Sequence, residues 1–269
     1  MAKYRPEMTD EGINRLHTTT VIDEFGKQRE LSLTGERPLT IYLDKREIVT
    51  LMTMGAQPEL LTLGYLRNQG LVEQIEDIKA IQVDWDVEAV AVTTRQARTD
   101  LDKVLSKRTV TSGCGQGTMF GNVMESLNDL SLQCPSFSAK KIYQVLDMVT
   151  EHNRMYKQAG AVHGCALSTQ DTVDIFVEDV GRHNAVDAIS GWMWLNAISG
   201  ADKVFYTTGR LTSEMVIKVA QMNVPLLLSR SGVTEMGLRL AQQIGIGMVA
   251  RAKGKHFLVY NGQDQFEEA

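Results

Sequence analysis

The sequence predicts an α/β fold, because a strand, a short loop and a helix follow one another three times in the second half of the chain. In the first unit, residues 172–192, Val173, Ile175 and Val177 alternate with polar residues, and the period becomes helical after Gly181. The other two units span residues 203–222 and 225–244. Parallel strands joined by helices gather their loops at one edge of a sheet, where ligands bind. A ligand site is therefore expected at that edge.

Each of the three loops carries an arginine and at least one glycine. The arginines are Arg182, which is followed by His183, then Arg210 and Arg230. A guanidinium beside the free N–H groups at the start of a helix suits an anion. For any single loop, an ion pair with a surface carboxylate is the commoner explanation. Three arginines at equivalent positions favour a ligand that carries phosphate.

The first helix of this series, which begins after Gly181, contains a candidate capping box. Asn184 is expected to cap the helix, and Asp187, three residues later, is expected to reach back to the cap.

Composition excludes several classes of protein. The chain has 269 residues, of which 43% are hydrophobic, enough for a substantial core. The net charge of −5 argues against general nucleic-acid binding. No apolar run reaches the roughly 18 residues that span a bilayer, and no hydrophobic segment of a secretory signal follows the first residues. These features predict a cytoplasmic protein that binds neither nucleic acid nor a membrane.

The N-terminal part, residues 1–110, is predicted to be a smaller α+β unit dominated by antiparallel strands. Residues 1–36 are polar and weakly patterned, so we expect partial disorder or pairing at a sheet edge. Strands are expected at 39–43, 47–51, 78–85 and 87–94, with a helix from Pro58 to Gly70. Residues 111–137 are expected to form a flexible linker, and residues 138–262 the α/β core.

In the core, one helix is expected over residues 138–158, strands over 161–167, 246–250 and 257–260, and a frayed tail after Asn261. The last two strands are joined by the most basic short segment of the chain. Its residues are Arg251, Ala252, Lys253, Gly254, Lys255 and His256.

Cys114 is the candidate reactive residue. It stands between Gly113 and Gly115, with Gly117 close by, and small neighbours leave a thiol accessible. Cys134 and Cys165 have apolar or proline neighbours and are expected in the core. Three widely spaced cysteines do not make a disulfide framework. No C-x-x-C pair or zinc-deaminase motif is present, so no metal site is expected.

Five segments together resemble the FdhD family of formate dehydrogenase accessory sulfurtransferases over residues 36–262. They are M-T-M-G-A-Q-P-E-L-L-T-L-G-Y-L-R-N-Q-G, T-S-G-C-G, G-A-V-H-G-C-A-L, E-D-V-G-R-H-N-A-V-D and T-G-R-L-T-S-E-M-V-I-K. The resemblance implies a three-layer α/β/α core similar to that of cytidine deaminase, without zinc.

The resemblance also implies a function. Members of the family take persulfide sulfur from a cysteine desulfurase and pass it to a molybdenum bis(pyranopterin guanine dinucleotide) cofactor, which serves the catalytic subunit of formate dehydrogenase. It gives Cys114 the sulfur-carrying position and residues 251–256 a cofactor-binding role. The arginine loops suit the phosphates, and a guanine nucleotide diphosphate is expected to mimic the cofactor.

One departure leaves alternatives open. The family pattern is commonly C-G-x-C, whereas this chain has Gly117 at the second cysteine position. Three functions therefore remain possible for this chain. It could transfer sulfur through Cys114 alone, or bind and carry the cofactor without catalysis. It could also be a cysteine hydrolase that uses Cys114 with His163.

A homodimer is also expected. Two guanine dinucleotide arms call for two pockets, which two-fold symmetry supplies. Trp192, Met193 and Trp194 offer more apolar surface than one sheet needs to cover.

Overall fold

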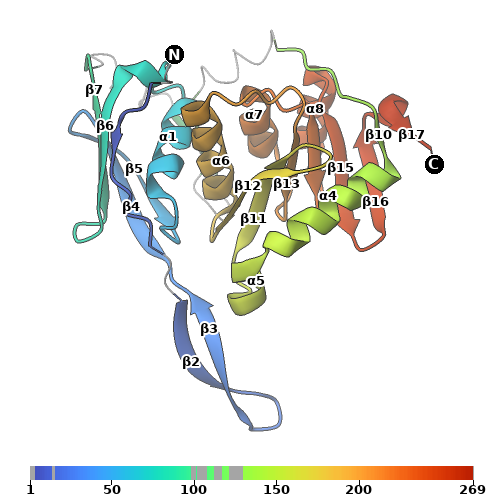
Figure 1. Cartoon of the computed structure of the whole chain (residues 1–269), viewed down its shortest axis with the longest axis horizontal. Helices are drawn as coiled ribbons and strands as arrows, with labels where there is room; N and C mark the ends of the chain where they lie inside the picture. The colour runs from blue at the N-terminus through green and yellow to red at the C-terminus, as the bar shows by residue number, and fades with distance from the viewer. Residues whose placement is uncertain are drawn as a thin grey trace.

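The computed structural model describes residues 4–13, 16–97, 101 and 130–268, and the backbone of β8 (Arg108–Thr111) and β9 (Gly117–Phe120). β8 and β9 pair antiparallel and flank the predicted cysteine segment, but Cys114 itself lies outside the described residues. Two sheets, one from each half of the chain, lie on either side of a layer of helices (Figure 1).

The first sheet has the strand order β1-β6-β7-β4-β5. The strands are β1 (Glu7–Met8), β4 (Arg37–Leu43), β5 (Arg46–Thr53), β6 (Ile78–Asp84) and β7 (Ala89–Thr94). All four predicted strands are present, and β4 pairs antiparallel with β5 and β6 with β7, whereas β4 pairs parallel with β7 and β1 parallel with β6. The sheet is therefore mixed, although most of its residue pairs are antiparallel, as the sequence predicts.

Helix α1 (Pro58–Asn68) covers this sheet, and η1 (Ile75–Asp77) precedes β6. As predicted, Pro58 starts the helix, and Gly70 follows its end in the left-handed region, at φ 64°.

The expectation for residues 1–36 is only partly correct. β1 does pair at a sheet edge, but β2 (Leu16–Ile22) and β3 (Gln28–Thr34) form a regular seven-pair hairpin. This hairpin projects from the body of the molecule (Figure 1). Its side chains are mostly exposed, so it lacks the hydrophobic alternation that would have revealed it in the sequence.

The second sheet has the order β12-β11-β13-β14-β15-β16. Its strands are β11 (His163–Ser168), β12 (Val173–Asp179), β13 (Val204–Thr207), β14 (Leu226–Ser229), β15 (Gly247–Lys253) and β16 (His256–Asn261). β11 is antiparallel to β12 and β13, and β13, β14 and β15 are parallel. The carboxyl ends of β12 to β15 therefore meet at one edge, as the sequence predicts.

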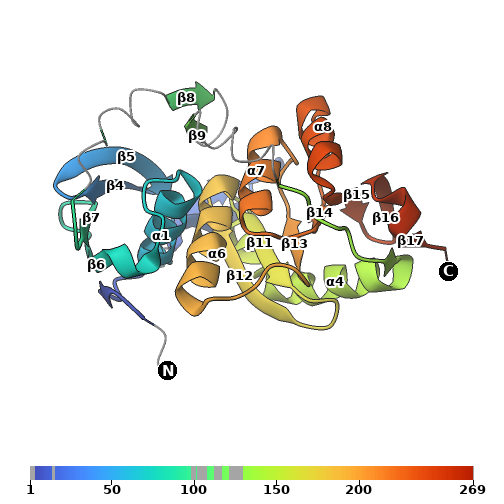
Figure 2. The same ribbon diagram turned by 90° about the horizontal axis from the view of Figure 1, so that it is seen from above.

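Helices cover both faces of the second sheet (Figure 2). α4 (Ala139–His152) packs on one face, whereas α6 (Arg182–Asn196), α7 (Ser213–Gln221) and α8 (Glu235–Ile244) pack on the other. The predicted helix over 138–158 is interrupted, because Asn153 has a non-helical ψ of 64° and α5 (Arg154–Ala159) starts after it. The α/β class is confirmed, whereas the likeness to cytidine deaminase stays a prediction, as do the boundaries at 110 and 137.

The tail after Asn261 is ordered up to residue 268, contrary to prediction. After η2 (Gln263–Gln265), β17 (Phe266–Glu267) pairs with β10 (Phe137–Ser138). The ring of Phe266 lies 5.7 Å from that of Phe137 and 6.0 Å from that of Phe257. These aromatic contacts hold the tail against the α4 face of the sheet.

The two halves meet where α1 crosses α6. A Cβ atom on Gly64 would lie 1.7 Å from the carbonyl oxygen of Asp187, and one on Gly191 would lie 2.0 Å from that of Leu60. The backbones can touch because neither helix has a side chain at this point. One hydrophobic cluster then runs from the first sheet through α1 and α6 into the second.

The same crossing covers the surface that the sequence assigns to a dimer. Met193 is buried, and Trp192 and Trp194 pack partly against the core. The guanidinium of Arg67, from α1, lies over the ring of Trp194. These residues therefore give no argument for a second copy. Within the described residues, no helix has the length and apolar character needed to cross a bilayer.

We expect Gly191→Ala to lower the free energy of unfolding by about 1–3 kcal/mol or more, because the added methyl meets backbone and forces the helices apart. Gly232→Ala is the control, since its Cβ would have no atom within 4 Å. It should change stability by less than about 0.5 kcal/mol. Urea unfolding of both variants measures the difference. Equal stabilities would show that the helices adjust freely at the crossing.

Candidate functional site at the carboxyl edge of the second sheet

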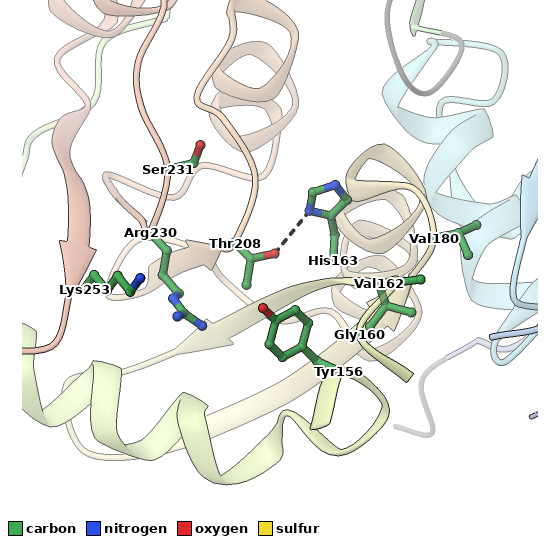
Figure 3. Close-up of a pocket in the computed structure, with 10 residues that line it drawn as sticks. Tyr156, Gly160, Val162, His163, Val180, Thr208, Arg230, Ser231 and Lys253 are labelled. Atoms are coloured by element: carbon green, nitrogen blue, oxygen red, sulfur yellow. Dashed lines mark hydrogen bonds between the residues drawn. The ribbon is translucent and has the colours of Figure 1, made fainter. Parts of the chain in front are cut away.

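A pocket of about 520 Å³ opens at the edge where the parallel strands end (Figure 3). Three of the expected loops and turns contribute to it, through Thr208, Arg230 with Ser231, and Lys253. The other lining residues are Tyr156, Gly160, Ala161, Val162, His163 and Val180. The structure thus brings together segments that are far apart in the sequence.

Buried hydroxyl groups at the strand ends hold the loops in place. Thr207 Oγ1 accepts a hydrogen bond from the Gly209 amide at 3.1 Å. Ser229 Oγ donates to the Gly209 carbonyl at 2.7 Å and accepts from the Ser231 amide at 2.9 Å. A backbone hydrogen bond from Leu211 to Gly232 joins the two loops further out. The pocket wall is therefore fixed by the end of the sheet.

His163 and Thr208 form a hydrogen-bonded pair in the pocket. Thr208 Oγ1 accepts from the Gly164 amide at 3.1 Å and lies 3.2 Å from His163 Nδ1. Burial lowers the pKa of His163, and the positive charges of Arg182 and Arg210 lower it further. The imidazole is thus held neutral at neutral pH, and its tautomer decides whether Nδ1 or the Thr208 hydroxyl donates the hydrogen bond between them.

The charged side chains of the pocket are cationic. Arg230 and Lys253 line it, and among its described lining residues none is acidic. Burial raises the pKa of the adjacent Tyr206 to about 12, although the nearby Arg230 favours the phenolate and opposes part of that rise. A pocket with two cations and no carboxylate is suited to an anionic ligand.

The remaining predicted residues take different places. Arg182 and His183 are buried at the start of α6, and Gly209 lies against the stem of Arg182, where a Cβ would come within 2.5 Å of Cδ. Arg210 is exposed and does not line the pocket. His183 Nε2 lies 3.4 Å from a carboxylate oxygen of Glu214. Burial, then Lys218 and Arg182, lower the pKa of His183 to about 2, so it is neutral.

The basic segment 251–256 is mostly strand, since β15 runs to Lys253 and β16 starts at His256. Ala252 is fully buried, whereas Arg251, Lys253, Gly254, Lys255 and His256 are exposed. Of these residues, Lys253 lines the pocket.

Tyr156 and Gly160 were missed as pocket residues. Tyr156 belongs to the end of the helix predicted over residues 138–158, and Gly160 follows it as the C-cap of α5, so the break at Asn153 turns this segment toward the sheet edge. Thr208 stands directly before the glycine of an arginine loop, and that position was its only signal in the sequence.

The two described cysteines are not reactive groups. Cys165 is fully buried, its thiol lies 3.2 Å from Thr207 Oγ1, and burial raises its pKa to about 12. Burial also raises the pKa of the half-buried Cys134 to about 11. Both are protonated near neutral pH, as expected for core cysteines. Among the described residues, no group of His, Cys, Asp and Glu could hold a metal ion.

The sequence profile of the FdhD/NarQ family matches residues 34–267. This chain belongs to the FdhD/NarQ family. It is 29% identical to the sulfur carrier protein FdhD of Wolinella succinogenes, over 92% of this chain and 88% of the relative. It is 30% identical to the protein of that name in Halalkalibacterium halodurans, over 84% and 85% of the two chains.

A solved structure is also similar. It is a crystal structure of a Desulfotalea psychrophila protein assigned as a formate dehydrogenase accessory protein, 26% identical to this chain. The two folds superimpose with a TM-score of 0.74, covering 94% of this chain and 99% of the other.

In this FdhD/NarQ chain, the segment E-D-V-G-R-H-N-A-V-D joins the two halves of the molecule. Asp179 accepts from Thr53 Oγ1 at 2.5 Å, from the Met54 amide at 3.1 Å and from Asn184 Nδ2 at 2.7 Å. Asn184 Nδ2 also donates to the carbonyl of Met52. The capping role predicted for Asn184 is therefore wrong, because Gly181 is the N-cap and Asn184 ties α6 to β5.

Asp187 is likewise not part of a capping box. It forms a buried ion pair with Lys218 of α7 at 2.7 Å and accepts from Asn68 of α1 at 2.7 Å. Asn68 in turn accepts from Ser190 at 2.9 Å. Burial raises the pKa of Asp187, and Lys218 counteracts that rise. Three helices thus meet on one carboxylate.

We expect Lys218→Met to lower the free energy of unfolding by about 3–5 kcal/mol, because it leaves the Asp187 carboxylate buried without its cation. Adding Asp187→Asn should recover most of the loss, since no charge then remains. Arg239→Met is the control, because Arg239 and Glu235 are both 77% exposed and such pairs contribute little. Thermal or urea unfolding measures all three variants. A full loss that persists in the double variant would contradict the charge explanation.

Proposed function

We propose that this chain is a sulfurtransferase, which takes persulfide sulfur from a cysteine desulfurase on Cys114 and passes it to molybdenum. The molybdenum belongs to the bis(pyranopterin guanine dinucleotide) cofactor that formate dehydrogenase requires, and the cofactor is cargo here. Support comes from family membership, from relatives named sulfur carrier proteins and from the similar formate dehydrogenase accessory structure. The observation that carries the proposal is the cationic pocket, which suits a phosphate-bearing cargo.

The pocket fits part of such a cargo in size and in charge. Its volume of about 520 Å³ is in the range of small-molecule sites, roughly 300–1,000 Å³. Arg230 and Lys253 would bind phosphate oxygens through charge-assisted hydrogen bonds. Arg210, Arg251 and Lys255 lie at or near the same edge and would extend the positive surface beyond the pocket. A homodimer would offer one such pocket to each dinucleotide arm.

Sulfur acceptance requires a thiol that can ionise. The Cys114 thiolate would attack the terminal sulfur of the desulfurase persulfide, forming a new S–S bond while the desulfurase cysteine leaves as a thiolate. Cys134 and Cys165 are poor candidates, because burial raises their pKa values to about 11 and about 12. With Gly117 at the second motif position, Cys114 would act alone.

That same glycine favours one second candidate function. Without a resolving cysteine, the chain would bind the cofactor and deliver it to formate dehydrogenase without handling sulfur.

We expect wild-type protein to gain the mass of one sulfur atom on Cys114 after incubation with a cysteine desulfurase and cysteine. Cys114→Ala should gain none, whereas Cys134→Ala and Cys165→Ala should gain it normally. Intact-protein and peptide mass spectrometry measure the addition. Retained nucleotide binding in Cys114→Ala shows that the variant is folded. If that variant still matures an active formate dehydrogenase, the sulfurtransferase proposal fails and the passive carrier replaces it.

We expect Arg230→Ala to weaken the binding of GDP by about tenfold to a hundredfold, because a charge-assisted hydrogen bond to phosphate contributes about 1.5–3 kcal/mol. Arg239→Ala removes an equal charge from an exposed helix position outside the pocket, so it should bind as the wild type does. Isothermal titration calorimetry, without added metal, compares the three proteins. Equal affinity in Arg230→Ala and wild type would remove this pocket from the proposal.

A further inference from the structure

The projecting hairpin of β2 and β3 has a well-formed turn. Asp23 Oδ1 accepts from the amides of Phe25 and Lys27, each at 3.0 Å. Arg29 pairs with the second oxygen of Asp23 at 2.6 Å. These hydrogen bonds lower the pKa of Asp23. The seven strand pairs have no register shift, so the hairpin is a regular two-stranded arm.

Such an arm is poorly stabilised by itself. A two-stranded hairpin is at best marginally stable in water, and three or more strands or a covering element are needed. β3 has a neighbour, since α5 lies against it. In the part of the chain that the structure describes, β2 pairs with β3 and has no strand on its other side. Within the same described residues β3 likewise has no second strand beside it, so both outer edges of the arm lack a strand, and β3 differs from β2 in its contact with α5.

The β2 edge also lacks the usual protection against pairing. Exposed edge strands are normally blocked by charges, proline, bulges or short length. β1 has two residues, β5 carries Arg46 and Glu47, and β12 has a bulge in its pairing and an Asp174–Lys203 ion pair. β2 reads L-H-T-T-T-V-I, seven residues with no Asp, Glu, Lys, Arg or Pro. Its Leu16 is 37% exposed and its Ile22 is 68% exposed.

We propose that the β2 edge pairs with the β2 edge of a second copy of this chain, antiparallel about a two-fold axis at Thr19. The order of residues in β2 fits its own reverse. Leu16 then lies opposite Ile22 of the other copy, and Thr18 lies opposite Thr20. The two arms become one four-stranded sheet.

The residues of β2 favour pairing with a second copy of β2 over pairing with a strand of another protein. A closed two-fold contact requires a self-complementary surface. Apolar pairs and threonine pairs are both favourable across antiparallel strands, and the absence of charge in β2 means that no like charges meet. β3 would bring Arg29 and Glu30 to the same contact, which is one more reason why β2 is the pairing edge. The interface does not depend on the proposed sulfur chemistry.

A pair of double variants that differ at one position tests the register. Thr18→Lys with Thr20→Lys places like charges opposite each other twice across the axis. Thr18→Glu with Thr20→Lys places opposite charges there. Within each arm, Thr18 faces Ser32 and Thr20 faces Glu30, so neither variant creates a like-charge pair between β2 and β3.

By light scattering at micromolar protein, wild type and the Glu/Lys variant should have the mass of two chains. The Lys/Lys variant should have the mass of one. A wild-type monomer, a Lys/Lys dimer or a Glu/Lys monomer would each overturn the proposal.

Cross-linking tests the same contact without added charge. In a Cys114→Ala background, Thr19→Cys should give a covalent dimer on mild oxidation, since residue 19 meets its own copy at the axis. Gln28→Cys, at the start of β3, is the control and should stay monomeric on denaturing gels. Equal cross-linking of the two variants, or none with Thr19→Cys, would contradict the proposed axis.

Discussion

The backbone contact between α1 and α6 at Gly64 and Gly191 is the constraint on which the rest of the structure depends. Because a Cβ on either glycine would lie within 2.0 Å of a backbone atom, the two helices fit together in one arrangement. Close contact also brings Asn68 and Ser190 next to the Asp187 carboxylate. A buried charge requires hydrogen bonds and a counterion, and Lys218 of α7 supplies the latter. One steric condition thus fixes the position of three helices.

Those helices determine where the carboxyl edge of the second sheet, with its cationic pocket, lies. α6 begins directly after β12, and Asp179 at the end of β12 binds Thr53 and Met54 of the first half. The start of α6, with Arg182 and His183, is therefore held against both halves at once. The loops at this edge hold Arg230 and Lys253 in position. Little conformational entropy of these side chains would therefore be lost when a ligand binds. The contact between the two halves and the carboxyl edge of the second sheet are therefore held by the same segment, the end of β12 and the start of α6.

The sequence allowed the second sheet to be predicted well, because its strands alternate or are wholly apolar and its helices start and end at clear signals such as Gly245. It could not show which polar residues serve the ligand and which serve the fold. Asn184 and Asp187 have the spacing of a capping box. In the structure, however, Asn184 binds the Met52 carbonyl and Asp187 pairs with Lys218. The β2–β3 arm was missed because exposed strands carry no burial pattern. Tyr156 was missed because the sequence around Asn153 contains no signal, such as proline or glycine, that predicts a break in the helix.

Charge distribution explains how a chain with a net charge of −5 can present a cationic pocket. Two acidic groups of the β12–α6 segment are engaged inside the protein: Asp179 by amide and hydroxyl donors, and Asp187 by Lys218. Burial and neighbouring cations hold His183 and His163 neutral, so neither adds to the desolvation cost of the site. Arg230 and Lys253 then face the pocket without a competing carboxylate among its described lining residues. A phosphate that entered the pocket would replace water around these two cations without displacing a salt bridge of the lining residues, and would form charge-assisted hydrogen bonds with them.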